Sequence, residues 1–260
     1  MTHPVPLRDV AGRRLDLRLA SAWPDDLAWI PVSATELHLA ARSFPLAVRE
    51  DDDGPRLGLL VGSAYLAQPL RAPGGAWRGG YQPIGLRCFP LSASGATGDP
   101  LADLTIDADA PCLSETDGVP IVDDAGRPTR PVVELHRLAT LLARSVDVFA
   151  PVLDHLMIAG LLAPLPATEP PDQNRVLVVD ARAFDRLDGT ALGAMARASY
   201  LSVDVAMAGL FSLQALRPDR RPQAARAGSA EAPAQTARAF DVPFDDLALA
   251  LDDGELVPFG

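Results

Sequence analysis

Apolar residues follow two different spacings along this chain, and the change comes near residue 130. Before it, short apolar runs at residues 28–32, 44–50 and 56–63 are separated by clusters of Gly, Pro and Asp. Such runs are typical of strands joined by turns. The letters DDDGP between the second and third runs predict a hairpin, because acidic residues followed by Gly favour a tight turn.

The same N-terminal half is expected to hold one short helix and two more strands. The segment SATE, from Ser33 to Glu36, is a capping-box pattern, in which a hydroxyl and a carboxylate satisfy backbone N–H groups at the start of a helix. This helix should end before Pro45, because the residue before a proline is poorly suited to helical geometry. Glycine-rich turns delimit the further strands expected at residues 87–93 and 101–107.

The second half of the chain favours helices. Thr129 is a suitable N-cap, and the apolar residues that follow recur at spacings of three and four, which places them on one helical face. These residues are Leu135, Leu138, Leu142, Val146 and Phe149. Pro151 is expected to kink or break this helix, because proline has no N–H to donate. A second helix is expected at residues 152–162.

Residues 175–180, RVLVVD, form the clearest strand pattern of the chain. Helices are expected after it at residues 181–187, 190–198 and 200–216. Strands followed by helices indicate the α+β class. We expect a turn-rich, mostly antiparallel β half packed against C-terminal helices. The strand at residues 175–180 should join the same sheet, which would make residues 1–216 a single domain.

The end of the chain changes character twice. Residues 217–239 are rich in Ala, Pro and Arg without a core pattern, which is typical of a flexible linker. Residues 240–260 hold six acidic residues, nine large apolar residues and no basic residue. This acidic, amphipathic tail is a candidate docking peptide, with Phe240 and Phe244 as binding residues. The alternative is that it folds back onto its own domain.

Composition narrows the classes of protein that remain. The formal net charge is −11, and all 23 basic residues are arginine. Such a chain lacks the basic face that nucleic acids and anionic lipid surfaces require. It shows no apolar run as long as a membrane span and no signal-peptide core at its start. We expect a cytoplasmic protein without nucleic-acid binding or membrane insertion, and with Cys88 and Cys112 unpaired.

Familiar catalytic motifs are absent from the sequence. His3, His38, His136 and His155 stand far apart and form no metal-binding pattern. His155 follows Asp154, but neighbours in sequence do not share a helical face, so a structural histidine is the favoured interpretation. A chain without lysine has no Walker lysine, and GxGxxG and GxSxG are missing as well. No cofactor is expected.

One group of carboxylates leaves a metal site open. Asp103, Asp107 and Asp109 would share one face of a strand, and Asp123 and Asp124 lie on the next turn. Clustered oxygens bind Ca²⁺ or Mg²⁺, so Asp107, Asp109 and Asp123 are weak candidates for metal ligands. A metal-assisted enzyme that uses this region is therefore an alternative function. The competing interpretation of the Asp123 segment is an ordinary hairpin turn.

A group of aromatic residues is the candidate binding surface of the N-terminal half. Trp77, Tyr81 and Phe89, with Arg87 among them, could line a binding groove. Aromatic residues at such a junction of strand and turn more often belong to a core, so both interpretations stay open.

Asp204 is the oddity of the apolar segment at residues 200–216. A carboxylate buried in a helix of this kind must find a partner or change its pKa. We expect a structural pair, in which Arg197 or a serine supplies the partner.

The most distinctive stretch of the chain runs from Trp77 to Pro131. It reads WRGGYQPIGLRCFPL and, further on, DADAPCLSETDGVPIVDDAGRPTRP. These segments resemble the aromatic and acidic motifs of the bacterial SapC family. The segments GLLAPL, RVLVVDARAFDRL and LFSLQAL continue the similarity, which runs from about residue 3 to residue 216 and excludes the linker and the tail.

The resemblance implies an accessory protein of a bacterial surface-layer or peptide-modification system, and it supplies no catalytic residues. The leading hypothesis is a non-catalytic adaptor that binds a peptide or protein partner. An exported surface-layer component is a further alternative, against which the missing signal argues. The oligomeric state is left open.

Overall fold

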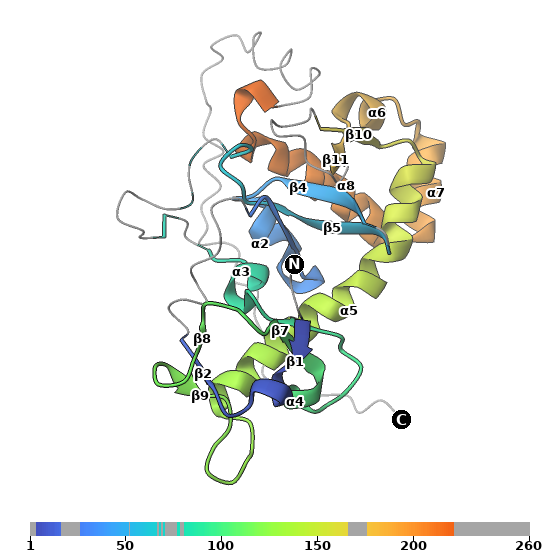
Figure 1. Cartoon of the computed structure of the whole chain (residues 1–260). Helices are drawn as coiled ribbons and strands as arrows, with labels where there is room; N and C mark the ends of the chain where they lie inside the picture. The colour runs from blue at the N-terminus through green and yellow to red at the C-terminus, as the bar shows by residue number, and fades with distance from the viewer. Residues whose placement is uncertain are drawn as a thin grey trace, which may run out of the picture.

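A five-stranded antiparallel sheet forms the upper part of the molecule (Figure 1). The computed structural model describes residues 4–16, 27–51, 53–66, 68, 70, 77–78, 81–165 and 176–220. The strand order in this sheet is β10 (Leu162–Pro164), β11 (Val176–Val179), β4 (Leu46–Asp51), β5 (Gly54–Leu60) and β3 (Trp29–Pro31).

The hairpin of β4 and β5 confirms the prediction made from DDDGP. Leu46 pairs with Leu59 at one end of the ladder, and Asp51 pairs with Gly54 at the turn. Gly54 has a φ of 111°, a conformation that residues with a side chain rarely adopt. The predicted strand at residues 175–180 is β11, and its pairing with β4 places it in the same sheet, as expected.

Two smaller antiparallel sheets form the lower part of the molecule in Figure 1. The first has the order β1 (Pro4–Pro6), β7 (Leu104–Asp107), β6 (Ser92–Ala93). The second has the order β8 (Leu113–Ser114), β2 (Arg14–Leu15), β9 (Val119–Pro120). The 3₁₀ helix η1 (Leu7–Val10) lies between β1 and β2, so the N-terminal segment contributes to both sheets.

One long helix, α5 (Arg130–Ile158), passes through both parts of the molecule (Figure 1). Pro151 does not break this helix, because it lies inside α5, and residues 152–158 continue α5 instead of forming the second helix expected at residues 152–162. Proline removes only one helical hydrogen bond, the bond to the carbonyl of Asp147. Phe149 and Val152 on either side of Pro151 are buried against the sheet, and this packing outweighs the lost bond.

The predicted capping box is confirmed at the start of the 3₁₀ helix η2 (Ala34–Glu36), which α2 (Leu37–Ala41) continues. The Glu36 carboxylate accepts the Ser33 N–H at 3.0 Å. Thr129 is the N-cap of α5, as expected, although its hydroxyl donates to the carbonyl of Pro120 at 2.8 Å instead of capping the helix.

The strands expected at residues 87–93 and 101–107 are shorter than predicted. The helix α3 (Ile84–Cys88) includes residues 87 and 88, and α4 (Pro100–Asp103) includes residues 101–103. Helix α4 begins there because the Asp99 side chain accepts the Leu101 N–H and proline suits the first helical position. Only β6 and β7 remain as strands in these two segments.

Three helices follow β11, as predicted: α6 (Ala181–Asp185), α7 (Gly189–Ala198) and α8 (Tyr200–Ser212). The 3₁₀ helices η3 (Leu213–Ala215) and η4 (Pro218–Arg220) complete the described part. Helix α8 lies so close to the sheet that a Cβ on Gly209 would come within 2.5 Å of Cγ2 of Val179.

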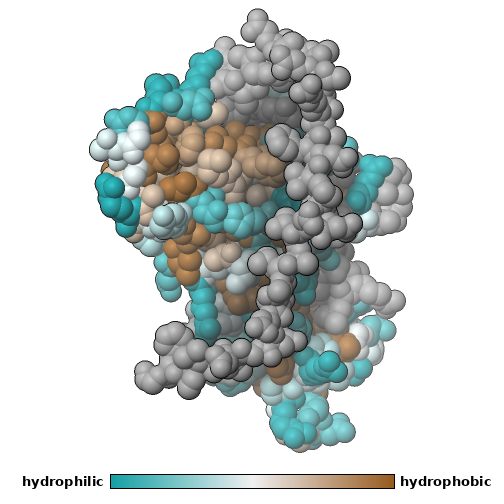
Figure 2. Space-filling view, turned by 180° about the vertical axis from the view of Figure 1, so that it is seen from behind, coloured by the Kyte–Doolittle hydropathy of each residue, from teal (hydrophilic) through white to brown (hydrophobic). Residues whose placement is uncertain are grey.

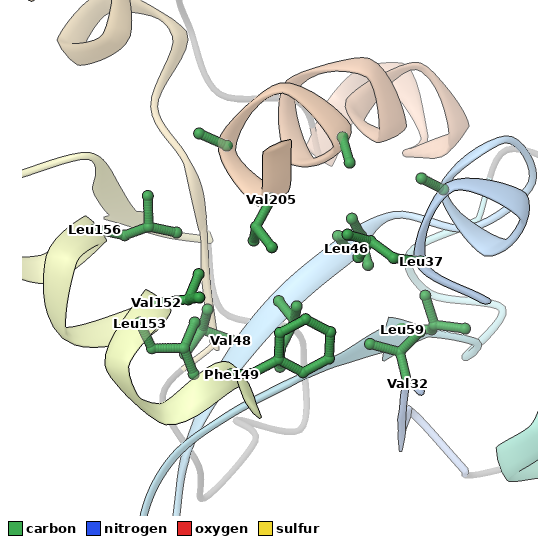
Figure 3. Packing of buried hydrophobic residues seen from close by; sticks show 14 of the residues in the cluster. Val32, Leu37, Leu46, Val48, Leu59, Phe149, Val152, Leu153, Leu156 and Val205 are labelled. Carbon is green, nitrogen blue, oxygen red and sulfur yellow. The ribbon is translucent and has the colours of Figure 1, made fainter. Parts of the chain in front are cut away.

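Two hydrophobic cores lie along α5. In the upper core, Phe149 and Val152 of α5 and Val205 of α8 point toward Val48 and Leu59 of the sheet (Figure 3). The lower core packs the first half of α5 against η1, α3 and the two small sheets. The protein is therefore of the α+β class, with antiparallel sheets in the N-terminal part packed against C-terminal helices, as predicted.

Candidate functional site

A cavity of about 550 Å³ lies between α5 and β3, where the upper and lower parts of the molecule meet. Its walls come from β3, the β4–β5 hairpin, residues 89–94 and the middle of α5. A second space of about 190 Å³ shares Trp29, Arg49, Arg56 and Val146 with it. The larger space, called the α5 cavity here, falls within the range of roughly 300–1,000 Å³ that is usual for ligand pockets.

The sheet wall of the α5 cavity carries a stacked Trp–Arg pair. A Cβ on Gly58 would come within 2.3 Å of the Trp29 ring, so only glycine leaves room for the ring at this place in β5. The guanidinium carbon of Arg49 lies 4.1 Å from the centroid of the Trp29 ring, which is a cation–π geometry. The Trp29 indole N–H donates to the carbonyl of Ala47 at 3.4 Å.

Two arginines occupy neighbouring positions on this wall. Arg49 and Arg56 are directly paired across the hairpin, an arrangement that charge repulsion disfavours. Asp51 offsets the repulsion, because it accepts two hydrogen bonds from Arg49 at 2.6 and 2.9 Å and lies 3.8 Å from Arg56. Arg56 also bonds the exposed Asp53 at 3.0 Å. Exposed ion pairs of this kind are weak, so an anionic ligand would compete with Asp53 for the Arg56 guanidinium.

The helix wall of the α5 cavity uses the face that the apolar spacing predicted. Leu142 and Val146 line it, and the small side chains of Ala139 and Ala143 leave the space open. Asp147 adds a carboxylate to this wall, is exposed, and forms no ion pair with another described residue. The two long walls therefore carry opposite charges, arginines on the sheet and a carboxylate on the helix.

Ser94 connects the α5 cavity to a buried polar cluster. The Asp103 side chain is fully buried and accepts hydrogen bonds from the Ser94 hydroxyl and from Nε2 of His136, the second at 2.8 Å. Burial raises the pKa of Asp103, but the bonds from Ser94, His136 and the Ala96 N–H outweigh it and hold the pKa below its usual value. Asp103 is therefore ionised at neutral pH and links α4, α5 and the segment after β6.

This cluster does not have the order of a catalytic triad. In a triad the histidine lies between the serine and the carboxylate, so that it can take the proton of the serine. Here the carboxylate of Asp103 lies between Ser94 and His136. The arrangement holds the Ser94 side chain in place beside the cavity.

The aromatic residues predicted to line one groove are divided between the upper core and the α5 cavity. Trp77 stacks on Phe44 with ring centroids 6.4 Å apart. Tyr81 donates to the buried carboxylate of Glu36, which also accepts the Ile84 N–H at 2.9 Å. Burial, followed by the hydrogen bond to Glu36, raises the pKa of Tyr81. Trp77 and Tyr81 both pack against the upper core.

Phe89 lies on the α5 cavity, unlike the other described members of that group. It precedes a cis peptide bond to Pro90, which also lines the cavity. Arg87 is exposed on α3. Phe240 and Phe244 lie outside the described residues. The assignment of these residues to binding stays a prediction.

The prediction that Asp103, Asp107 and Asp109 share one face of a strand is wrong. Asp103 belongs to α4, Asp107 ends β7, and Asp109 lies in the turn after it, where its N–H donates to the Asp107 side chain at 3.1 Å. Asp123 accepts hydrogen bonds from the backbone and side chain of Arg127, and these bonds lower its pKa. Within the described ranges, no three His, Cys, Asp or Glu residues are grouped so that they could hold a metal ion.

Asp204 pairs with a residue that the sequence did not indicate. Its carboxylate lies 2.9 Å from Nε2 of His38, so the expected structural pair is present, but the partner is neither Arg197 nor a serine. The reason is that this side of α8 faces α2. The structural interpretation of His155 is supported by its bond to the Ser202 hydroxyl at 2.9 Å.

The two cysteines are buried and unpaired, as expected. Burial raises the pKa of the Cys88 thiol to about 12, since the apolar surroundings disfavour the thiolate.

Sequence reasoning missed most of the residues that line the α5 cavity, among them Trp29, Arg49, Arg56 and Asp147. One signal was available for the arginines. Side chains alternate between the two faces of a strand, so Arg49 and Arg56, on opposite sides of the DDDGP turn, could have been placed opposite each other on one face. Nothing local in the sequence places Trp29 or Asp147 beside them.

Fold and cavity together define an α+β protein with a ligand-sized space where its two parts meet. The family model of SapC matches residues 11–218. The chain belongs to the SapC family, which confirms the resemblance found in the sequence. No curated protein and no solved structure matches the chain. Among the described residues, no helix has both the length and the apolar character needed to cross a membrane.

Proposed function

We propose that the protein is a non-catalytic accessory protein that binds a peptide or protein partner, and that the α5 cavity receives an apolar side chain of that partner. The observation that carries the proposal is the cavity itself, about 550 Å³ in volume, with apolar residues from α5 and β3 and charged residues of both signs on its walls. Sites of this kind bury an apolar group and orient it by a few polar contacts.

The charges support a peptide as the ligand. A peptide offers carboxylate groups to Arg56 and backbone N–H groups to oxygen acceptors. Arg56 pairs with the exposed Asp53 and lies 3.8 Å from Asp51, which is itself bonded to Arg49, and Asp147 forms no ion pair with another described residue. Pro151 has no N–H for the backbone carbonyl of Asp147, which leaves that carbonyl without its usual helical donor. A peptide lying along α5 would supply a carboxylate to Arg56 and a backbone N–H to the Asp147 carbonyl.

The finer parts of the proposal rest on family membership and on composition. We propose that the partner belongs to a bacterial surface-layer or peptide-modification system, because the chain belongs to the SapC family. We also propose a cytoplasmic location, which the composition supports.

The test is a selection of peptides on the full-length protein. A phage-displayed library of random peptides is panned, and the enriched peptides are measured against two variants by titration. Val146→Trp fills the α5 cavity from a position that is 39% exposed, and Val148→Trp places the same ring on the same helix at a position that is 44% exposed and does not line the cavity. Both variants should fold equally well.

We expect the enriched peptides to lose binding to Val146→Trp and to keep it with Val148→Trp. Arg56→Gln should weaken binding by about tenfold if a carboxylate of the peptide pairs with this guanidinium. Arg137→Gln, in an exposed pair with Glu134 on α5, is the matched control for the change of charge. Failure to enrich any peptide, or equal binding to both tryptophan variants, would refute the proposal.

A further inference from the structure

The side of α8 that carries Asp204 also holds large apolar residues that are exposed to solvent. Tyr200, Met207 and Phe211 are seven and four residues apart, so they lie along one side of the helix. They are 83%, 51% and 53% exposed, and Leu39 of the neighbouring α2 is 45% exposed. Figure 2 shows hydrophobic residues gathered in the upper part of the molecule seen from behind. These four residues are called the α8 stripe.

The composition of α8 differs from that of an ordinary surface helix. Its inner positions, such as Val205 and Gly209, are buried against the sheet, as expected. A surface helix would carry polar residues on its other side. Helix α8 instead has a single charged residue, Asp204, and that residue is paired with His38. Asp204 lies four residues after Tyr200 and three before Met207, so its carboxylate, which is paired with His38, lies among these apolar side chains. Exposed apolar side chains that are grouped on one helix in this way mark a candidate interaction site.

Two exposed arginines belong to the helices next to α8 in the sequence or in space. Arg42 follows α2 four residues after His38 and lies on the same side of that helix. Arg197 lies in the last turn of α7, three residues before Tyr200. Both are exposed, and neither forms an ion pair with another described residue. The helices next to α8 therefore add two guanidinium groups, those of Arg42 and Arg197, to this part of the surface.

The C-terminal tail has the complementary composition. Residues 240–260 carry six acidic residues, nine large apolar residues and no basic residue. The described part of the chain ends at Arg220, soon after α8. A random coil of the length of residues 221–239 has a root-mean-square span of roughly 24 Å. This span is close to the length of α8, roughly 20 Å for its 13 residues. A linker of this span would allow the tail to reach along α8, and linking two parts in one chain raises their effective concentration.

We propose that residues 240–260 dock on the α8 stripe of the same chain. The apolar side chains of the tail cover Tyr200, Met207 and Phe211, and its carboxylates pair with Arg42 and Arg197. The surface is separate from the α5 cavity, so this inference does not depend on the peptide ligand proposed for that cavity.

The test is photocrosslinking within the full-length chain. Phe244 is replaced by benzoylphenylalanine, the protein is irradiated, and the crosslinked peptides are identified by mass spectrometry. We expect an intramolecular crosslink to residues 200–212 or to Leu39, with a yield that does not change with protein concentration. The same photoreactive residue at Ala230, within the tether, is the control and should give no such product.

Variants of the stripe give the second arm of the test. Met207→Ser combined with Phe211→Ser should lower the crosslink yield by about tenfold, the effect expected when a buried anchor is lost. Val133→Ser changes an apolar residue that is 46% exposed at the other end of the molecule, and should leave the yield unchanged. In the protein with an unaltered stripe, high salt should lower the crosslink yield, because salt screens the pairing of the tail carboxylates with the arginines.

Three results would overturn the proposal. The first is the absence of any crosslink to α8 or α2. The second is a crosslink between two chains whose yield rises with concentration, which would make a second copy the occupant of the stripe. The third is a crosslink to residues 89–94 or 142–147, which would place the tail in the α5 cavity.

Discussion

The α5 cavity and the α8 stripe are both apolar, but they are built in different ways. The cavity is concave, its walls come from four segments far apart in sequence, and hydrogen-bonded charges hold those walls in place. The stripe is an exposed surface, and three of its four residues come from one helix. A concave, supported site selects one side chain or small ligand, whereas an exposed face offers only area to a partner.

The α5 cavity should therefore be more sensitive to mutation than the α8 stripe. Residues that support the cavity should be costly to replace, because their partners are buried and cannot turn to water. Replacing residues of the stripe should change the free energy of unfolding little, because their side chains already contact solvent.

The largest effect is expected for the carboxylate beneath the cavity. Asp103→Ala leaves the Nε2–H of His136 and the Ser94 hydroxyl without their acceptor, and the Ala96 N–H keeps only its bond to the Ser94 hydroxyl oxygen at 3.3 Å. We expect the free energy of unfolding to fall by about 3–5 kcal/mol in urea denaturation. Asp123→Ala, which removes the partner of the exposed Arg127 side chain, is the control and should lower the free energy of unfolding much less. Equal losses in the two variants would show that the cluster does not support the cavity.

The second largest effect on stability is expected for the sheet wall of the α5 cavity. In Gly58→Ala the new Cβ would come within 2.2 Å of the carbonyl oxygen of Ile30 and 2.3 Å of the Trp29 ring, so backbone or ring must move. We expect a loss of about 2–3 kcal/mol in the same denaturation experiment, together with weaker peptide binding. Gly98→Ala has no atom within 4 Å of the new Cβ and should change the stability little. A stable Gly58→Ala protein with unchanged binding would contradict this description of the wall.

The dependence of stability on pH tests the same cluster of Asp103, Ser94 and His136 in a second way. The pKa of Asp103 is lower in the folded protein than its usual value of 3.8. Its ionised form is therefore favoured by folding, and this contribution is present above about pH 4 and lost as pH falls through the lowered folded pKa. The free energy of unfolding should decrease more steeply below about pH 4 in the unaltered protein than in Asp103→Asn. Parallel curves for the two proteins would be evidence against the pKa shift.

The smallest effect is expected on the α8 stripe. Phe211→Ser should lower the free energy of unfolding by less than about 1 kcal/mol, because more than half of the residue is exposed. Phe149→Ser, which removes a ring that is 2% exposed in the upper core, should cost about 3–5 kcal/mol. Similar losses in both would mean that the stripe is a part of the core and not a docking surface.

The features that could be predicted from the sequence are those that local chemistry specifies. The capping box at Ser33, the DDDGP hairpin and the strand RVLVVD each follow from a few neighbouring residues, and all three are present. The local rule failed at Pro151, where burial of Phe149 and Val152 on both sides keeps α5 continuous. Tertiary packing outweighs the loss of one hydrogen bond in this helix.

The candidate site could be predicted only in small part. The apolar spacing in α5 correctly placed Leu142 and Val146 on one face, and Phe89 was among the predicted binding residues. Trp29, Arg49 and Asp147 meet at the cavity because β3, the hairpin and α5 pack together, and no local pattern records that packing. The predicted carboxylate face is wrong because the three residues do not belong to one strand. Asp103 is buried in α4, whereas Asp107 and Asp109 lie at the end of β7 and in the turn after it.

The most direct test of the central claim is an NMR titration of the full-length protein with a peptide selected by panning. The chain has three tryptophans, and Trp29→Phe and Trp77→Phe assign the two indole N–H signals of interest. Trp29 lines the α5 cavity, whereas Trp77 packs on Phe44. We predict that the Trp29 signal shifts on binding while the Trp77 signal stays in place. A shift of Trp77 alone, or of neither signal, would contradict the assignment of the α5 cavity as the binding site.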